Sequence, residues 1–283
     1  MLKDSIGKDD LFCPSVSSKL QQITLNSVRG VLPDKAIEQA CRQVQYSYRR
    51  RKLTPIVTVL HMILAAVWPE ESLTASWHVL WDWAVACFPA LTGQSPSSGS
   101  VAKARARLPV RLWHAIFAWL AVRAGELSEP FAFWRGHRVV LVDGTCVSMP
   151  DRGDLHAAFG TSTGRGGSGR YPLARMVTLA LAQTMTVVSY ALGRYRDSEK
   201  ALLKMQLGRL HPGDLLVGDR HFAGANLYAD YLAAGLMFLT RAHQRLKISR
   251  LRRILSHAAG DFVTDLAVNS KHRREDPSLP RTV

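Results

Sequence analysis

Apolar residues recur at the three- and four-residue spacing of amphipathic helices through the first 130 residues of the chain. Thr54 and Pro55 form a typical helix start, a capping residue followed by proline at the first helical position. The pattern predicts helices over residues 34–46, 55–67, 72–88 and 110–124. It indicates a helical domain at residues 33–130, preceded by a loosely ordered N-terminus at residues 1–32.

The pattern changes near Gly136, where short runs of β-branched and other apolar residues begin. It predicts strands over residues 137–142, 174–183, 186–192, 215–218, 236–240 and 262–268, and helices over residues 198–210 and 226–234. Strands interleaved with helices indicate a mixed α/β sheet. The segment GTSTGRGGSG at residues 160–169 predicts a flexible loop, and it lacks the G-K-[ST] ending of a P-loop.

The chain carries 37 lysines and arginines against 22 aspartates and glutamates, so its formal net charge is +15. Such an excess favours a polyanionic partner, because binding releases the counterions that surround a polyanion. Composition alone leaves nucleic acid and an anionic membrane open. A membrane-spanning helix needs roughly 20 predominantly apolar residues. The longest clean apolar run, residues 55–68, is shorter and contains His61, so we expect no membrane insertion.

The cysteines and the N-terminus bear on the compartment. The four cysteines are Cys13, Cys41, Cys87 and Cys146. They form no CxxC pair and no Cys/His spacing typical of zinc, and the simplest interpretation is reduced thiols in a cytoplasmic protein. The first residues, MLKDSIGKDD, contain no apolar segment of a secretory signal.

Positive charge gathers in three short segments of the chain. These segments contribute Arg49, Arg50, Arg51 and Lys52, then Lys103, Arg105 and Arg107, and finally Arg241 and Arg245. The cluster at residues 49–52 could form a solvated surface or a set of contacts to nucleic-acid phosphates, and the other two segments are expected to contact DNA. In a chain of this net charge we favour phosphate contacts.

Two aspartates follow buried strands in the second part of the chain. Asp143 follows the run VVLV and Asp219 follows LLVG, and each lies beside a glycine. A carboxylate at the end of a buried strand is a common position for a site at a sheet edge, and two such carboxylates can hold Mg²⁺ or Mn²⁺. Two metals can activate a water and stabilise the leaving oxygen of a phosphodiester. The alternative is structural, because an aspartate after a strand often forms a turn or caps a helix.

The sequence around both aspartates resembles the insertion-sequence-4 family of DDE transposases. The segment VVLVDGTCVSMPD at residues 139–151 is similar to the family's first-aspartate motif. Residues 214–241, which contain GDRHF and end in FLTR, are similar to the second-aspartate motif. Two N-terminal segments, LPDKAIEQAC at residues 32–41 and VAKARARLP at residues 101–109, resemble the helical domain that precedes the family's catalytic core.

This resemblance implies an α/β fold, an incomplete ribonuclease H-like mixed sheet preceded by an all-α N-terminal domain. The core would occupy residues 137–243 without its final helix, and residues 244–283 would begin a β-rich insertion. Asp143 and Asp219 would be the first and second ligands of Mg²⁺ or Mn²⁺. In the second motif, Arg220 would contact a phosphate or form an internal salt bridge, and Phe222 would pack in the core. His221 is a weaker functional candidate.

No third acidic ligand is found. The family carries its glutamate in a helix with the pattern Tyr, two residues, Arg, three residues, Glu, six residues, Lys. The only glutamate after Asp219 is Glu275, and its matching positions hold Val268, Lys271 and Thr282. Pro277 also argues against a helix interior there, while Glu199 precedes Asp219 and fails the same pattern. We therefore expect a C-terminally truncated copy, a fragment or one part of a split reading frame.

The resemblance implies a transposase of an insertion sequence that cleaves DNA at the ends of its element and transfers the strands. It implies double-stranded DNA at transposon ends and target as partner, a homodimer on DNA, and a place near the nucleoid in a bacterial cytoplasm. Without the third carboxylate we expect defective catalysis. Two alternatives stay open, a truncated non-catalytic DNA-binding competitor of the full-length enzyme and a decayed copy.

Overall fold

The computed structural model shows a helical part and a part built on a β-sheet. The residues that it describes are 25–49, 51–67, 72–87, 91, 94–128, 133–164, 167–243, 246–247, 251, 253–258 and 261–283. The chain divides into two compact units, Met1–Arg123 and Ala124–Val283. Among the described helices, none has the length and apolar character needed to cross a membrane.

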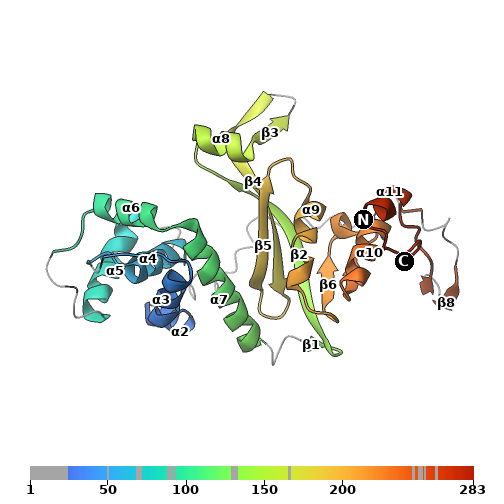
Figure 1. The fold of residues 1–283 in the computed structure, drawn as a ribbon, viewed down its shortest axis with the longest axis horizontal. Helices are drawn as coiled ribbons and strands as arrows, with labels where there is room; N and C mark the ends of the chain where they lie inside the picture. The colour runs from blue at the N-terminus through green and yellow to red at the C-terminus, as the bar shows by residue number, and fades with distance from the viewer. Residues whose placement is uncertain are drawn as a thin grey trace, which may run out of the picture. The chain divides into compact units, whose positions relative to one another are not determined.

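Helices make up the first unit (Figure 1). They are α2 (Leu25–Val31), α3 (Asp34–Gln43), α4 (Pro55–Val67), α5 (Leu73–Cys87), α6 (Ser98–Arg107) and α7 (Val110–Ser128), the last of which runs into the second unit. The helix predicted over residues 55–67 is confirmed at both ends, and the one predicted from residue 34 ends at Gln43 instead of residue 46. Residues 25–31 of the predicted loose N-terminus are helical, and residues 1–24 lie outside the described part.

Local capping starts these helices and a shared apolar core holds them together. Thr54 Oγ1 accepts a hydrogen bond from Val57 N at 3.3 Å ahead of α4, and Ser97 Oγ accepts one from Ser100 N at 3.3 Å at the start of α6. The large side chains that are fully buried in this core include Leu32, Ile37, Leu60, Leu64, Trp77, Leu80 and Leu112.

His61 is a polar member of the same core. Its side chain lies on α4, and its Nε2 atom is 3.2 Å from both Leu73 O and Ser76 Oγ on α5. Burial lowers the pKa of His61 below its ordinary value. The neutral ring therefore connects two helices near neutral pH without placing a charge in the core.

The second unit is built on a seven-stranded mixed sheet with the strand order β3-β4-β2-β6-β7, in which β1 also pairs with β2 and β5 with β4. The strands are β1 (Phe133–Trp134), β2 (His137–Ser148), β3 (Thr161–Gly164), β4 (Gly167–Leu181), β5 (Thr186–Arg194), β6 (Leu215–Gly218) and β7 (Met237–Thr240). Strand β2 is antiparallel to β4 and parallel to β6, which is parallel to β7. This mixed sheet, with helices before it in the chain, confirms the predicted fold class.

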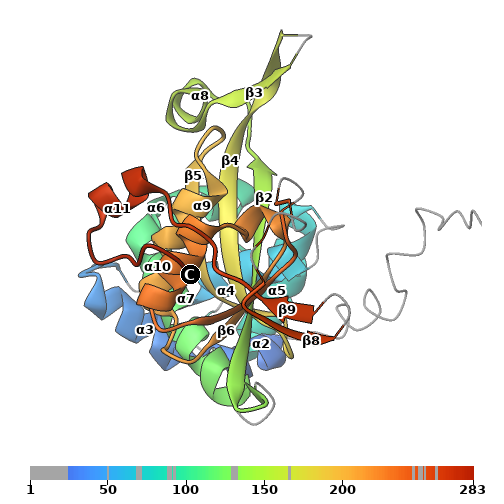
Figure 2. The ribbon, with the colours of Figure 1, turned by 90° about the vertical axis from the view of Figure 1, so that its right-hand side faces the viewer.

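Helices pack on this sheet through a second apolar core (Figure 2). They are α9 (Glu199–Lys204) and α10 (Ala225–Ala233), with the short 3₁₀ turns η2 (Leu207–Arg209) and η3 (Arg220–Phe222) between them, whereas α8 (Gly153–Phe159) has no buried residue and takes no part in this core. Val140 and Leu216 from adjacent strands are completely buried against Leu203 of α9 and Tyr231 of α10. The predicted helix over residues 198–210 is split, because α9 ends at Lys204 and η2 follows.

The glycine-rich segment at residues 160–169 is not the flexible loop that its composition predicts. Strand β3 and the start of β4 form an antiparallel hairpin, in which Thr163 pairs with Ser168 and Gly164 with Gly167. A Cβ atom on Gly169 would lie 2.3 Å from Ser162 Oγ. The glycine therefore permits close packing of two strands, a use that composition does not distinguish from flexibility.

The end of the chain also differs from its predicted pattern. The strand predicted over residues 262–268 is shorter, β9 (Asp261–Val263), and it pairs with β8 (Leu255–Ala258). The polar tail contains a helix, α11 (Ser270–Glu275), which Asn269 caps by accepting from Lys271 N at 2.8 Å. Val268 and Leu279 pack with Ala229 of α10 in a small apolar cluster of their own, so this segment is attached to α10.

One buried ion pair fixes the start of the parallel strands. Asp214 precedes β6 and is paired with Arg138 of β2, with side-chain exposures of 4% and 18%. Its carboxylate accepts from Arg138 Nε at 2.9 Å and from His211 N at 2.8 Å. Its backbone oxygen accepts from Met237 N at 2.9 Å, at the start of β7. Asp214 thus connects the beginnings of three neighbouring strands.

We predict that Asp214→Ala lowers the free energy of unfolding by about 3–5 kcal/mol, because it leaves the Arg138 charge buried and unpaired. Asp154→Ala is a matched control: Asp154 binds Arg152 with the same two-bond geometry, but the two side chains are 61% and 65% exposed. Its loss should cost less than about 1 kcal/mol. Urea unfolding of both variants measures the difference, and equal losses would contradict a special role for the buried pair.

Candidate active site and nucleic-acid interface

The parallel pairing of β2 with β6 brings two predicted site residues to one edge of the sheet. Val142 pairs with Gly218 at the last step of this register. Asp143 and Asp219 are the next residues on these neighbouring strands. Strand β6 ends at Gly218, whereas β2 continues past its predicted end at residue 142 to Ser148, so Asp143 lies within β2 beside the carboxyl end of β6. The register therefore makes the two aspartates neighbours although 76 residues separate them in the sequence.

Each aspartate accepts a backbone hydrogen bond with one of its carboxylate oxygens. Asp143 Oδ1 accepts from Gly144 N at 2.8 Å, and Asp219 Oδ1 accepts from His221 N at 2.8 Å, which makes Asp219 the cap of η3. Both residues are exposed. Within the described part of the chain, neither Oδ2 atom has a hydrogen-bond partner. The capping role considered from the sequence therefore occurs at Asp219 and leaves the second oxygen accessible to a ligand.

The loop after β6 is packed closely against its neighbours. A Cβ atom on Gly218 would lie 2.7 Å from Val142 Cγ1 and 3.2 Å from Phe222 Cβ. Phe222 is 1% exposed, which confirms its predicted place in the core. Tyr231 donates a hydrogen bond to Phe222 O at 3.1 Å, and burial raises the pKa of Tyr231. Asp219 therefore projects from a rigid part of the fold.

Other charged side chains lie at the same edge. Arg241 follows Thr240, which pairs with Gly218 across β6 and β7, and its side chain is exposed. His221 Nε2 is 3.4 Å from Glu199 Oε2. Sequence reasoning missed Glu199 at this site, because no local signal links residue 199 to either aspartate. In the sequence, only Gly144, which follows Asp143, indicates that another side chain packs closely against this part of β2.

The sheet and its two aspartates lie in a segment that matches a known family. The family model described as the transposase DDE domain matches residues 134–279, just over half of the chain. The chain belongs to the DDE transposases. No curated protein matches this transposase. The family's reaction is DNA transposition, so its substrate is DNA, and the family generally uses a divalent metal.

The two aspartates of the transposase fit a divalent cation in part. Carboxylate oxygens are the ligands that Mg²⁺ and Mn²⁺ prefer, and each aspartate offers one. Within the residues that the structure describes, no group of three or more His, Cys, Asp or Glu side chains could hold a metal ion. A cation bound by Asp143 and Asp219 would therefore need further ligands from water or DNA phosphates.

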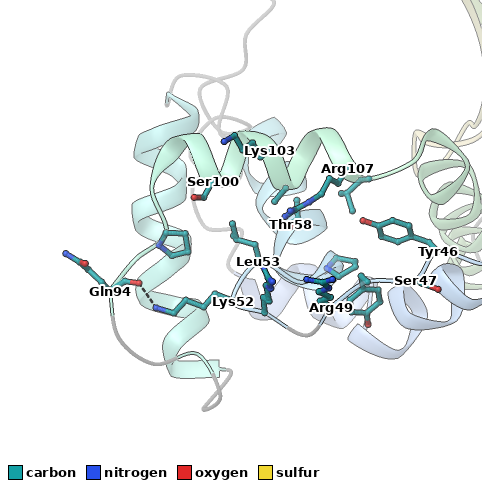
Figure 3. Close-up of a pocket in the computed structure, with 16 residues that line it drawn as sticks. Tyr46, Ser47, Arg49, Lys52, Leu53, Thr58, Gln94, Ser100, Lys103 and Arg107 are labelled. Carbon is teal, nitrogen blue, oxygen red and sulfur yellow. Dashed lines mark hydrogen bonds between the residues drawn. The ribbon is translucent and has the colours of Figure 1, made fainter.

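Two of the basic segments of the transposase meet at one hollow of about 640 Å³ in its first unit (Figure 3). Lys103 and Arg107 line it from α6, and Arg49, Arg51 and Lys52 line it from the segment before α4. Tyr46 and Tyr48 also line it, with their rings stacked at a centroid distance of 6.1 Å. All five cationic side chains belong to exposed residues. The structure thus joins two segments that the sequence shows only as separate clusters.

Helix geometry explains which charges of α6 reach the hollow. Residues four apart lie on the same face of a helix, whereas residues two apart do not. Lys103 and Arg107 share a face and line the hollow, while Arg105 is exposed on another face and does not line it. Lys52 Nζ donates to Gln94 O at 2.8 Å and lies 5.8 Å from the Trp81 ring centroid, so its ammonium is held in place.

Three other arginines predicted to contact DNA lie outside the hollow or outside the described residues. Arg50 and Arg245 lie outside the described residues. Arg220 is half-buried in η3, directly after Asp219. The two roles predicted for Arg220, a phosphate contact and an internal salt bridge, both stay predictions.

Proposed function

We propose that this transposase is of the insertion-sequence-4 type and that Asp143 and Asp219 hold Mg²⁺ or Mn²⁺ for DNA strand cleavage and transfer at the ends of its element. One observation carries the proposal: the register Val142–Gly218 sets both aspartates at one sheet edge. A bound divalent cation would supply Lewis-acid stabilisation of phosphate charge.

The protein groups at this edge suit a phosphodiester substrate. Two carboxylates would repel a phosphate, so a cation between them is needed before DNA can approach. Arg220 directly follows Asp219, and Arg241 follows Thr240, which pairs with Gly218; both arginines can contact phosphate oxygens. The Oδ1 contacts of Asp143 and Asp219 orient both carboxylates before any ligand binds.

The third carboxylate of the family pattern has no counterpart in these 283 residues. Glu275 is the last residue of α11, its side chain is 64% exposed, and Pro277 follows. We therefore propose that these residues bind the metal and DNA but cleave strands poorly, since one negative ligand of the family's set is missing.

We predict that Asp143→Asn and Asp219→Asn each weaken Mn²⁺ binding at least about tenfold, because each removes one anionic ligand. Electron paramagnetic resonance of free Mn²⁺ measures the affinity of the 283-residue chain. Asp154→Asn, an exposed acid in α8, is the control that should bind as the parent does. Equal affinity in all four proteins would overturn the metal site. If the parent chain nicks supercoiled DNA strongly and Asp143→Asn abolishes this activity, the metal site is supported and the proposal of weak cleavage is wrong.

A second function, DNA binding without cleavage, is favoured by the position of the basic hollow. The hollow is lined by residues between Tyr46 and Leu108, which lie outside the matched segment 134–279. We propose that DNA phosphates occupy it, since five cations and two hydroxyl-bearing tyrosines face one concave surface. A chain that binds transposon ends in this way and does not cut them would compete with an active transposase.

We predict that Arg107→Ala weakens binding to double-stranded DNA and lowers the slope of log affinity against log salt by about one, whereas Arg105→Ala changes both much less. Both substitutions remove one exposed arginine from α6, so net charge is matched. Fluorescence anisotropy of a labelled duplex at several salt concentrations gives both quantities. Equal effects would show that diffuse charge, and not the hollow, binds the DNA.

The resemblance to the insertion-sequence-4 family also suggests how many copies of the chain bind DNA together. We propose that the chain acts as a homodimer on transposon-end DNA in a bacterial cytoplasm. Analytical ultracentrifugation of the chain with a duplex tests the stoichiometry, and one protein per duplex at saturation would contradict it.

A further inference from the structure

Glu199 is an acidic side chain that the fold turns toward the interior. It is the first residue of α9, and its side chain is only 16% exposed. Residues three and four positions apart share a helix face, and Leu202 and Leu203 are buried in the core. Glu199 therefore lies on the core-facing side of α9, where an apolar residue would be expected.

The carboxylate of Glu199 rests on the backbone of the first-aspartate motif. A Cβ atom on Gly144 would lie 2.5 Å from Glu199 Cδ and 2.8 Å from its Oε2. Since real side chains essentially never approach so closely, any residue with a Cβ at position 144 would displace Glu199. The glycine beside Asp143 is thus the space that this carboxylate occupies.

The same carboxylate reaches the second-aspartate motif. Its Oε2 atom is 3.4 Å from His221 Nε2, and the backbone N–H of His221 is the group that donates to Asp219 Oδ1 at 2.8 Å. Its Oε1 atom is paired with Arg175 of β4, which also donates from Nε to Tyr195 O at 3.0 Å. Glu199 is therefore anchored to β4 and contacts both β2 beside Asp143 and the turn that follows Asp219.

We propose that Glu199 is a positioning residue of the Asp143–Asp219 site. It acts in two ways. Its contacts with Gly144 of β2 and with His221 hold Asp143 and the turn that Asp219 caps at a fixed separation. Its negative charge also neutralises Arg175, whose guanidinium would otherwise oppose a divalent cation nearby. The inference rests on the proposed metal-binding function and assigns Glu199 no direct contact with the metal.

Glu199→Gln tests this role, because the amide keeps the shape of the side chain and removes its charge. Outer-shell partners typically contribute about 10- to 100-fold to metal affinity. We expect Glu199→Gln to weaken Mn²⁺ binding by the 283-residue chain by at least about tenfold. Glu275→Gln is the matched control: it removes the same charge from the only glutamate that follows Asp219, and it should leave Mn²⁺ affinity unchanged.

A second variant separates positioning from charge. Gly144→Ala alters no charge but forces Glu199 away from β2, and we expect it to weaken Mn²⁺ binding in the same direction. Thermal unfolding of each variant is measured alongside. A lowered melting temperature with unchanged Mn²⁺ affinity in both variants would show a purely structural role and overturn the proposal.

The same measurements distinguish failure of the Glu199 role from failure of the proposed metal site. If the parent chain binds Mn²⁺ and Asp143→Asn abolishes it while Glu199→Gln does not weaken it, only the role of Glu199 fails. If the parent chain binds no Mn²⁺ that depends on Asp143, the proposed metal site fails and the role of Glu199 fails with it.

Discussion

The parallel register between β2 and β6 is the constraint on which the candidate active site depends. Val140 and Leu216 pair in this register and are both fully buried, so a slip of one residue would turn apolar side chains out of the core. The Arg138–Asp214 ion pair fixes the same register at the other end of the strands. With the register set, Asp143 and Asp219 have no freedom to be elsewhere than at one edge.

Local signals in the sequence were sufficient for some of the elements. The Thr54-Pro55 start of α4 and the strand before Asp219 depend only on neighbouring residues, and both are confirmed, whereas the strand predicted over residues 137–142 continues past Asp143 to Ser148. The hairpin at residues 161–169 was not predictable, because glycine carries no side-chain pattern that separates a loop from a closely packed strand. The predicted metal and DNA contacts remain predictions.

Features that depend on long-range contact could not be predicted in the same way. Glu199 reaches Gly144 and His221 only because α9 packs on the sheet, and no spacing in the sequence encodes that meeting. The basic hollow likewise joins Arg49 and Arg107, which lie on separate segments of the first unit. In both cases residue type and helix periodicity gave the candidates, and tertiary packing decided which of them act together.

The central claim is that Asp143 and Asp219 bind one divalent cation between them. Anomalous diffraction from crystals soaked in Mn²⁺ tests it most directly. The account predicts a manganese peak about 2.0–2.3 Å from a carboxylate oxygen of each aspartate, close to the distances at which hard cations bind oxygen. A peak bound to only one of them, or manganese found only elsewhere on the transposase, would contradict it.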